Sequence, residues 1–330
     1  MAVASEARNI FALVRKGIDA RAVHSHVRKP FRFLLCGDPE LIVHLRALLL
    51  SGHAETVPLD AAACLETIRL GTPLVTDPAE VRAIIFLGRP GDLAGADFAS
   101  LRTLHVPIFA VTVDPTVEPS GPQAAPSAGA AGEYVVPAIA REALRGRLFP
   151  HLVECSRGVE IAVGRRLPAL RDTVAAKLTR DAANTALKVS VASAVVDHVP
   201  LVGVVLGAFA SAGDMVAITG IQVMLMLHIE ATYGRDPDVQ RAWQLLPVIG
   251  GGFGWRTLAR ELVGFVPVAG VAIKGAIAYA GTIVVGESVT FFLEHGHHMT
   301  KGQTTQLFDR TKSDAMRFTR DLVAKLRRRE

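Results

Sequence analysis

The chain has 330 residues, a formal net charge of +5 and hydrophobic side chains at 50% of its positions. This length is sufficient for two domains that each bury a core of their own. Aromatic residues make up only 6%, which disfavours the stacking surfaces that bind single-stranded nucleic acid. The three widely spaced cysteines, Cys36, Cys64 and Cys155, indicate neither a disulfide framework nor a zinc site. We therefore expect a reducing compartment, no nucleic-acid partner and no bound metal.

Residues 1–30 predict a basic amphipathic helix. Ile10, Phe11, Val14 and Ile18 share one face, while basic side chains occupy much of the other. We expect this helix to pack on the following domain, with contact to a membrane surface as the alternative. Its charges are scattered and it has no continuous apolar core, so no secretory signal is predicted.

Residues 31–155 predict an α/β domain with a parallel sheet, because near-continuous apolar runs alternate with helical segments. Between the last two apolar runs, residues 114–132 are rich in Pro, Ala, Ser and Gly and predict a loop. The expected strands are Phe31–Cys36, Thr56–Pro58, Val81–Gly88, Val106–Asp114 and Tyr134–Val136, and the expected helices are Glu40–Leu50 and Ala140–Leu152.

Gly37 follows the first predicted strand, which is where a phosphate-binding loop would begin. A P-loop needs a second Gly, a Lys and a Ser or Thr at fixed spacing, so that the backbone, the ammonium and the hydroxyl hold phosphates and magnesium. The corresponding residues in this chain are Ile42, Val43 and His44. The sequence therefore lacks the groups that handle the terminal phosphates of a nucleotide.

Val111-Thr112-Val113-Asp114 stands where a guanine-reading N-K-x-D motif would lie, and only Asp114 matches it. Pro137-Ala138 takes the place of the Ser-Ala pair that supports guanine. In its order of elements, the domain resembles a small GTPase. The resemblance implies a degenerate GTPase-like fold, and a receiver-like or generic Rossmann-like sheet is the alternative. The candidate residues for a residual nucleotide or anion site are Gly37, Asp38 and Asp114.

Residues 156–185 predict a helical connector, and residues 186–298 predict an apolar, glycine-rich helical domain with an internal repeat. Val199–Val204 recurs as Val266–Val271, and after one inserted residue Gly207–Gly213 matches Gly275–Gly281. Small residues in such rows let helix backbones approach closely. The candidate helix-packing residues are Gly203, Gly207, Gly213, Gly270, Gly275 and Gly281.

Two apolar arms of this domain, Gly203–His228 and Leu262–Gly286, exceed the roughly 20 residues that cross a bilayer core. Each contains one charge, Asp214 and Lys274 respectively. In lipid, such charges face a bundle interior and find a partner, whereas Asp214 would also suit a solvated hairpin turn. The arms therefore predict either membrane insertion or a soluble helical core.

A series of short segments in this domain occurs in a specific order and spacing. They are His198–Gly203, Gly213-Asp214, Gln222–Leu227, Tyr233-Gly234, Pro247–Arg256, Phe265–Gly270 and Ala276–Thr282. In these segments the region from about 184 to 296 resembles the YcjF/GTPase-associated domain of unknown function. The resemblance implies membrane association and proximity to GTPase modules, and it implies no established reaction.

Residues 299–330 predict a second basic amphipathic helix. Ala315, Phe318, Leu322 and Leu326 form its apolar face, and it ends in a basic run that an anionic membrane surface would attract. The histidines just before it, His295, His297 and His298, are expected to lie in a solvated linker rather than to bind a metal.

The sequence thus predicts an α/β domain followed by an all-α helical-hairpin domain. The chain has neither a G-x-S-x-G elbow nor an H-E-x-x-H pair. We expect a non-enzymatic protein of the bacterial inner membrane whose bulk faces the cytoplasm, with no cofactor and no small-molecule substrate. Its expected partners are membrane lipid or an anionic membrane surface, a second copy or another protein. A nucleotide-binding switch with an atypical site and a soluble helical scaffold are the alternatives.

Overall fold

A computed structural model describes residues 20–52, 57–72, 77–118, 131–196, 203–240 and 267–327. The chain divides into two compact units. The α/β unit comprises His24–Val174 together with Ala231–Arg235. The helical unit comprises Ala175–Glu230 and the described parts of Met1–Val23 and Asp236–Glu330. The division between them falls inside one continuous helix, α8 (Arg171–Val196), so the chain passes from the first unit to the second without a linker.

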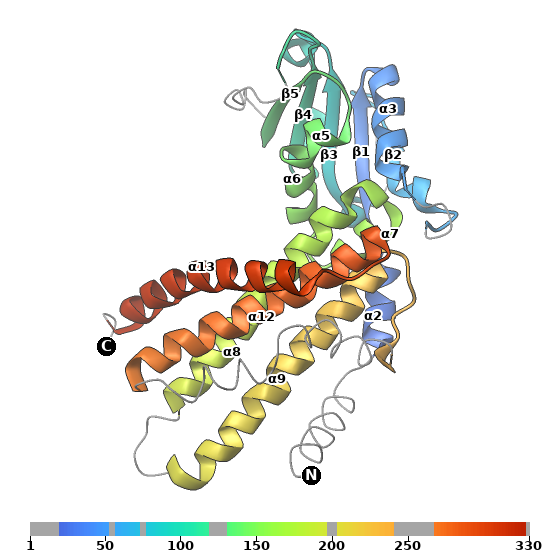
Figure 1. Ribbon diagram of the computed structural model, residues 1–330. Helices are drawn as coiled ribbons and strands as arrows, with labels where there is room; N and C mark the ends of the chain where they lie inside the picture. Colours follow the sequence, from blue (N-terminus) through green and yellow to red (C-terminus); the bar gives the residue numbers. More distant parts are fainter. Residues whose placement is uncertain are drawn as a thin grey trace. The chain divides into compact units, whose positions relative to one another are not determined.

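The α/β unit is built on a parallel sheet whose five described strands are ordered β2-β1-β3-β4-β5 (Figure 1). This is one of the two common strand orders of doubly wound sheets. The predicted parallel sheet is therefore confirmed, while a GTPase-like identity stays a prediction. The strands are β1 (Arg32–Gly37), β2 (Leu65–Thr67), β3 (Val81–Gly88), β4 (Ile108–Val113) and β5 (Gly132–Val136).

The two faces of the sheet are covered differently. Helix α3 (Pro39–Leu50) leads from β1 to β2, and α4 (Ala99–Arg102) leads in the opposite direction from β3 to β4, so right-handed crossovers place them on opposite faces. On the α4 face, short segments complete a core of Leu34, Ile84 and Ile108. The opposite face is lined by the alternate residues of the same strands. There the ring of Phe109 contacts His151 of α6 (Leu148–Glu154).

The structure corrects two predicted elements. The strand expected at Thr56–Pro58 is absent from the described residues of that segment, since Val57 is a bend and Pro58 has no regular secondary structure. The edge strand is instead Leu65–Thr67. The helix expected at Ala140–Leu152 is two helices, α5 (Arg141–Arg145) and α6, with a turn at Gly146 and Arg147 between them. The described residues of the unit also include four 3₁₀ turns, namely η2 (Ala61–Cys64), η3 (Pro78–Glu80), η4 (Asp92–Gly95) and η5 (Pro168–Leu170).

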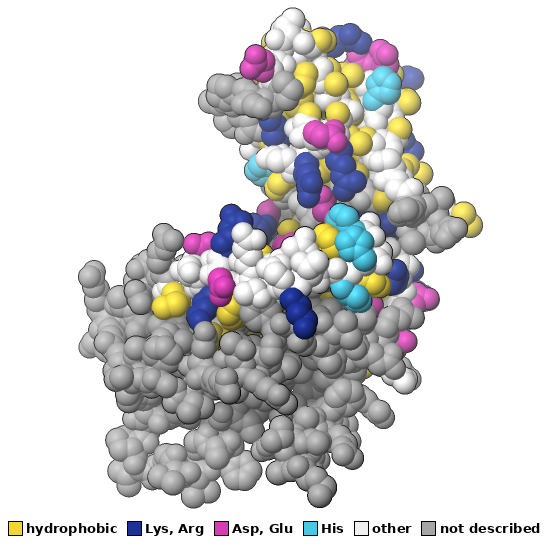
Figure 2. All heavy atoms as spheres, viewed as in Figure 1, with side chains coloured by type: hydrophobic (Ala, Val, Ile, Leu, Met, Phe, Trp, Pro, Cys, Tyr) yellow, Lys and Arg dark blue, Asp and Glu magenta, His cyan; other side chains and the backbone are white. Residues whose placement is uncertain are grey.

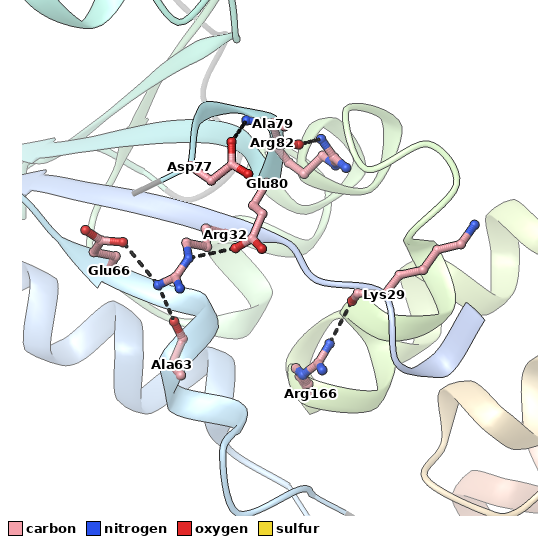
Figure 3. Close-up of polar contacts among 9 residues, drawn as sticks. All are labelled: Lys29, Arg32, Ala63, Glu66, Asp77, Ala79, Glu80, Arg82 and Arg166. Carbon is pink, nitrogen blue, oxygen red and sulfur yellow. Dashed lines mark hydrogen bonds and ion pairs between the residues drawn. The ribbon is translucent and has the colours of Figure 1, made fainter. Parts of the chain in front are cut away.

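Arg32 joins three segments at the amino end of the sheet (Figure 3). Its guanidinium donates to Glu80 of η3 at 3.0 Å and to Glu66 of β2 at 3.2 Å. It also reaches the carbonyl oxygen of Ala63 at 3.4 Å. All three charged side chains are about one-third exposed. These bonds hold the short strand β2, which has only three residues, against β1.

The segment predicted as a connector does not stand apart from the sheet. Helix α7 (Glu160–Arg166) and η5 belong to the α/β unit, and Ala162, Val163 and Leu170 are fully buried. Helix α8 begins in the same unit, where Asp172 in its first turn pairs with Arg145 at 2.7 Å. The segment is helical, and its role as a connector between domains stays a prediction.

The helical unit contains the rest of α8 and the helices α9 (Gly203–Thr232), α12 (Pro267–His295) and α13 (Lys301–Arg327) (Figure 1). The two predicted apolar arms correspond to α9 and α12. Helix α9 runs unbroken through Gly213-Asp214, so the alternative of a turn at these residues is wrong. Pro267 opens α12, where its fixed φ and missing N–H are tolerated.

Helices α12 and α13 pack side by side as a hairpin. Ile277, Ala280 and Val284 of α12 form a small core with Phe308 of α13. The turn is fixed at Thr300 and Gln303, which form a capping box: the Thr300 amide donates to the Gln303 side chain at 2.9 Å, and the Gln303 amide donates to the Thr300 hydroxyl at 3.3 Å. The sequence expectation of a tail helix is confirmed, although the side chains of Phe318, Leu322 and Leu326 lie outside the described residues.

At the other end of the chain, α2 (Ala20–Val27) covers the last part of the predicted N-terminal helix, and Ile10, Phe11, Val14 and Ile18 lie outside the described residues. The cysteines all belong to the α/β unit. Cys36 and Cys64 are buried and Cys155 is partly buried, and burial raises the pKa of each thiol to about 12.

Candidate functional site at the carboxyl end of the sheet

The strand order places a switch point between β1 and β3. From β1 the chain passes to β2 on one side, and from β3 it passes to β4 on the other. In open sheets of this type, ligands bind in the crevice outside the carboxyl ends of the two strands at such a point. The residues to consider are therefore those that follow Gly37 of β1 and Gly88 of β3.

The backbone at Gly37, at the end of β1, packs tightly against the end of β3. Gly37 has a φ of +109°, and a Cβ placed there would lie 2.0 Å from the carbonyl oxygen of Leu87. The next amide, that of Asp38, donates to the same oxygen at 2.8 Å. The predicted site residue Gly37 is thus required by the backbone path itself, independently of any ligand.

Asp38 is the N-cap residue of α3, and its carboxylate caps the helix. One carboxylate oxygen accepts from the amides of Glu40 at 2.8 Å and Leu41 at 3.3 Å. The other pairs with the Arg89 guanidinium at 3.2 Å. Partial burial alone would raise the pKa of Asp38, but the Arg89 hydrogen bond and the two amides outweigh it and hold the pKa below its ordinary value. Amides that would receive a phosphate at a helix start are therefore already bonded to an anion.

Arg89 is a residue of this position that sequence reasoning did not single out. It follows β3 directly, its side chain is 59% exposed, and it also pairs with Glu40 at 3.1 Å. Its amide donates to Asp92 at 2.7 Å. A signal was present in the sequence, because a charged residue directly after a buried strand and a Gly lies at the ligand-binding edge of a parallel sheet.

Asp114 lies at the same edge, after β4, but on a strand that does not neighbour β1. Its carboxylate accepts from the amide of Thr116 at 2.9 Å and from the Thr116 hydroxyl at 2.7 Å. These bonds lower the pKa of Asp114. The structure therefore brings the three predicted site residues to one edge of the sheet, and each carboxylate is engaged by the local chain. A nucleotide site at these residues stays a prediction.

The predicted packing glycines and lone charges lie on α9 and α12, and most of their surroundings fall outside the described residues. At Gly281 a Cβ would meet the Gln222 side chain at 3.8 Å, which is an ordinary contact, so no close helix approach to the described residues requires this glycine. Gly275 is buried in α12. The side-chain surroundings of the others, Gly203, Gly207, Gly213, Gly270, Asp214 and Lys274, are not among those described.

A close helix approach does exist in the helical unit, at a glycine that the repeat did not include. A Cβ on Gly286 of α12 would lie 2.2 Å from the hydroxyl oxygen of Thr179 on α8. Nearby, the Gln222 amide of α9 donates to Thr282 of α12 at 3.4 Å. Small and polar side chains thus join α12 to α8 and α9, as expected for closely packed helices.

Within the described part of the chain, no group of three or more His, Cys, Asp or Glu side chains is placed to hold a metal ion. The rings of His295 and His297 lie against Phe291, and His298 stacks on Phe292 at 4.6 Å. All three histidines are exposed.

Comparison with protein-family models, with curated proteins and with solved structures found no match to this chain. The assignment of a function therefore depends on the chemistry of the residues described above.

Proposed function

We propose that this protein is a non-enzymatic regulatory protein of the membrane surface, in which the α/β unit is an interaction module and the helical unit mediates membrane association. In this proposal the α/β unit does not hydrolyse nucleotide. The protein associates with a membrane, as the YcjF-like resemblance implies, and it does so as a peripheral protein.

The observation that carries the first part is the state of Asp38. Its carboxylate bonds to the starting amides of α3 and to Arg89, at the position where this type of sheet binds ligands. A phosphate entering there would have to displace this carboxylate and would be repelled by it. The absence of a P-loop Lys and Ser or Thr at Val43 and His44 supports the same conclusion.

The packing of α12 supports peripheral rather than spanning association. Gly275–His295 is long and apolar enough to cross a membrane, and half of it is buried within the structure. This segment packs along α13, whose described part is largely polar on its visible face (Figure 2). A charged side chain at the bilayer centre costs about 2.5–3.5 kcal/mol or more. A spanning α12 would bring into the bilayer the charges of α13, namely Lys301, Asp309, Arg310, Lys312 and Asp314.

The basic C-terminal end supplies an attraction to anionic lipid. Each Lys or Arg near such a surface contributes about 1 kcal/mol. The sequence from residue 317 onward has an excess of basic residues. The basic residues are Arg317, Arg320, Lys325, Arg327, Arg328 and Arg329, and the acidic residues are Asp321 and Glu330.

Membrane fractionation tests the proposal. We expect the full-length protein to sediment with membranes and to be released by alkaline carbonate or high salt. Retention after carbonate would show integral insertion, and recovery in the soluble fraction at low salt would exclude membrane association. Purified protein should also bind vesicles containing anionic lipid and ignore neutral ones.

A triple variant tests the basic end. Replacing Arg327, Arg328 and Arg329 by Gln should weaken binding to anionic vesicles about a hundredfold, since three charges contribute about 3 kcal/mol. The control replaces the exposed residues Arg69, Arg102 and Arg157 of the α/β unit by Gln, which removes the same charge and should leave binding nearly unchanged. Equal losses in both variants would contradict a role of the C-terminal end.

Calorimetry with GTP and ATP in the presence of magnesium tests the α/β unit. We expect no heat of binding at millimolar nucleotide. Saturable binding would instead favour the alternative of a nucleotide switch.

A further inference from the structure

Three consecutive residues of α7 contact three different parts of the α/β unit. Gly164, Arg165 and Arg166 lie in the last turn of this helix, and Gly164 is buried. Their partners are the end of α9, the start of α8 and the segment that enters β1. Two of these partners, α8 and α9, continue into the helical unit.

The end of α9 is held by Gly164 and Arg165. A Cβ on Gly164 would lie 2.3 Å from the Cγ2 of Thr232, so only glycine allows this approach. The Arg165 guanidinium donates to the carbonyl oxygens of Ala231 at 3.4 Å and Arg235 at 3.1 Å. A cation that bonds the carbonyls at a helix end stabilises that end. Ala231 and Thr232 are fully buried, so the end of α9 is an integral part of the α/β unit.

The start of α8 is held by the same residues of α7. The Arg171 guanidinium donates to the Gly164 carbonyl oxygen at 3.2 Å and lies over the ring of Tyr233, 5.8 Å from its centroid. Arg171 is only 5% exposed. One side chain at the first position of α8 therefore contacts both α7 and the residues that follow α9.

On the sheet side, Arg166 connects α7 to the entry of β1. Its guanidinium donates to the carbonyl oxygen of Lys29 at 3.1 Å (Figure 3) and lies 5.6 Å from the centroid of the Phe31 ring. The Lys29 ammonium in turn donates to the Gly158 carbonyl oxygen at 3.0 Å. The segment before β1 and the loop before α7 are thus bonded in both directions.

We propose that Gly164-Arg165-Arg166 is a coupling joint. It links the amino end of the sheet to the start of α8 and the end of α9, so that a change in the α/β unit is transmitted to the helical unit through both helices together. This inference rests on the proposed function, because it describes how an interaction module would act on the membrane-associated unit.

Hydrogen exchange on the full-length protein tests the joint. In the wild type, the amides of Thr232–Arg235 should lose protection at the same urea concentration as β3. Arg165→Ala should speed their exchange about tenfold, because it removes two charged hydrogen bonds to the helix end. Arg157→Ala, which changes an exposed arginine of the same unit, is the control and should leave these amides unchanged.

Gly164→Ala tests transmission beyond the joint. The new Cβ should displace Thr232 and speed exchange both at Thr232–Arg235 and at Gln222–Leu227, which lie in the helical unit. The double variant Gly164→Ala/Thr232→Ser removes the clashing methyl and leaves the Thr232 Cβ at 3.5 Å, so it should restore both rates. This rescue separates the joint from a general failure to fold.

Two results would overturn the proposal. One is unchanged exchange at Thr232–Arg235 in both single variants, and the other is loosening there while Gln222–Leu227 keeps its wild-type rate. Vesicle binding measured on the same samples keeps the two proposals distinguishable. If the wild-type protein does not bind anionic vesicles, the proposed function is wrong, whatever the hydrogen-exchange result.

Discussion

The two ends of the parallel sheet are held together by different means. At the carboxyl end, Asp38 and Glu40 pair with Arg89 through exposed or partly exposed side chains, and the Asp38 carboxylate also caps α3. At the amino end, arginines donate to backbone carbonyls and to carboxylates across segments distant in sequence, as Arg32 and Arg166 do.

The difference shows where the fold depends on its polar residues. Exposed ion pairs contribute about 0–1 kcal/mol, whereas hydrogen bonds that involve a charged group contribute about 1.5–3 kcal/mol when they are shielded from water. The bonds of Arg32 and Arg166 are partly buried and lie between these limits. The end at which ligands bind in this type of sheet is therefore fixed mainly by backbone packing at Gly37. The opposite end, where α8 and α9 attach, is fixed by directed side-chain bonds.

The largest expected effect tests backbone packing at the carboxyl end. Gly37→Ala should lower the free energy of unfolding of the α/β unit by about 3–5 kcal/mol, because it combines a positive φ with a clash against the Leu87 carbonyl. Gly91 has a similar φ of +97° and no described atom within 4 Å of a built Cβ. Gly91→Ala should therefore cost only about 1 kcal/mol. Urea unfolding followed by circular dichroism measures both, and equal effects would show that the close contact is unimportant.

The next effect tests the side-chain bonds of the amino end. Arg32→Gln should destabilise the α/β unit by about 1–2 kcal/mol, since two partly exposed carboxylates lose their partner. Arg69→Gln, at an exposed position, should change stability by less than about 0.5 kcal/mol. Calorimetry measures the unfolding of both variants. If both unfold at the wild-type temperature, the Arg32 bonds do not contribute to stability.

A smaller effect is expected at the helix cap. Asp38→Ala should cost about 1 kcal/mol, whereas Asp38→Asn should be nearly neutral at pH 7 because Asn also caps helices. The pKa of Asp38 is lowered in the folded state, so its contribution to stability is present above the ordinary pKa of an aspartate. It is lost as the pH falls through the lowered value. Acid unfolding curves should therefore be shallower for Asp38→Asn than for the wild type, and identical curves would contradict the assignment.

The smallest effect is expected at Arg89. Arg89→Gln should cost less than about 1 kcal/mol, and the difference from the wild type should vanish in 1 M salt, because the pair is exposed and screened. A larger loss that survives high salt would show that this end of the sheet depends on its ion pairs after all.

Much of the sheet could be predicted because β1, β3 and β4 are dominated by apolar residues. Val81–Gly88, for example, matches β3 at both ends. Strand β2 could not be found in this way, because Leu65-Glu66-Thr67 is short and contains a charged residue. Glu66 pairs with Arg32, and this pairing is visible only in the structure. Local hydrophobic pattern thus identified buried strands and missed the strand that ion pairs hold in place.

The candidate site was predicted in part for a similar reason. Gly37 and Asp38 follow a strong strand signal, so their place at the sheet edge could be inferred from the sequence. The pairing of Arg89 with Asp38 could be predicted only with the strand order, which places β3 next to β1. The contacts of Gly164 and Arg165 with the end of α9 join residues more than 60 positions apart, and no local pattern indicates them.

The cysteines give the α/β unit a built-in chemical reporter. All three belong to that unit, and the helical unit carries no thiol. Cys36 and Cys64 are buried, and burial raises the pKa of each thiol to about 12, which suppresses the reactive thiolate in the folded state. Alkylation of these two residues therefore requires the sheet to open, and a mass spectrum taken over time reports opening of the α/β unit alone.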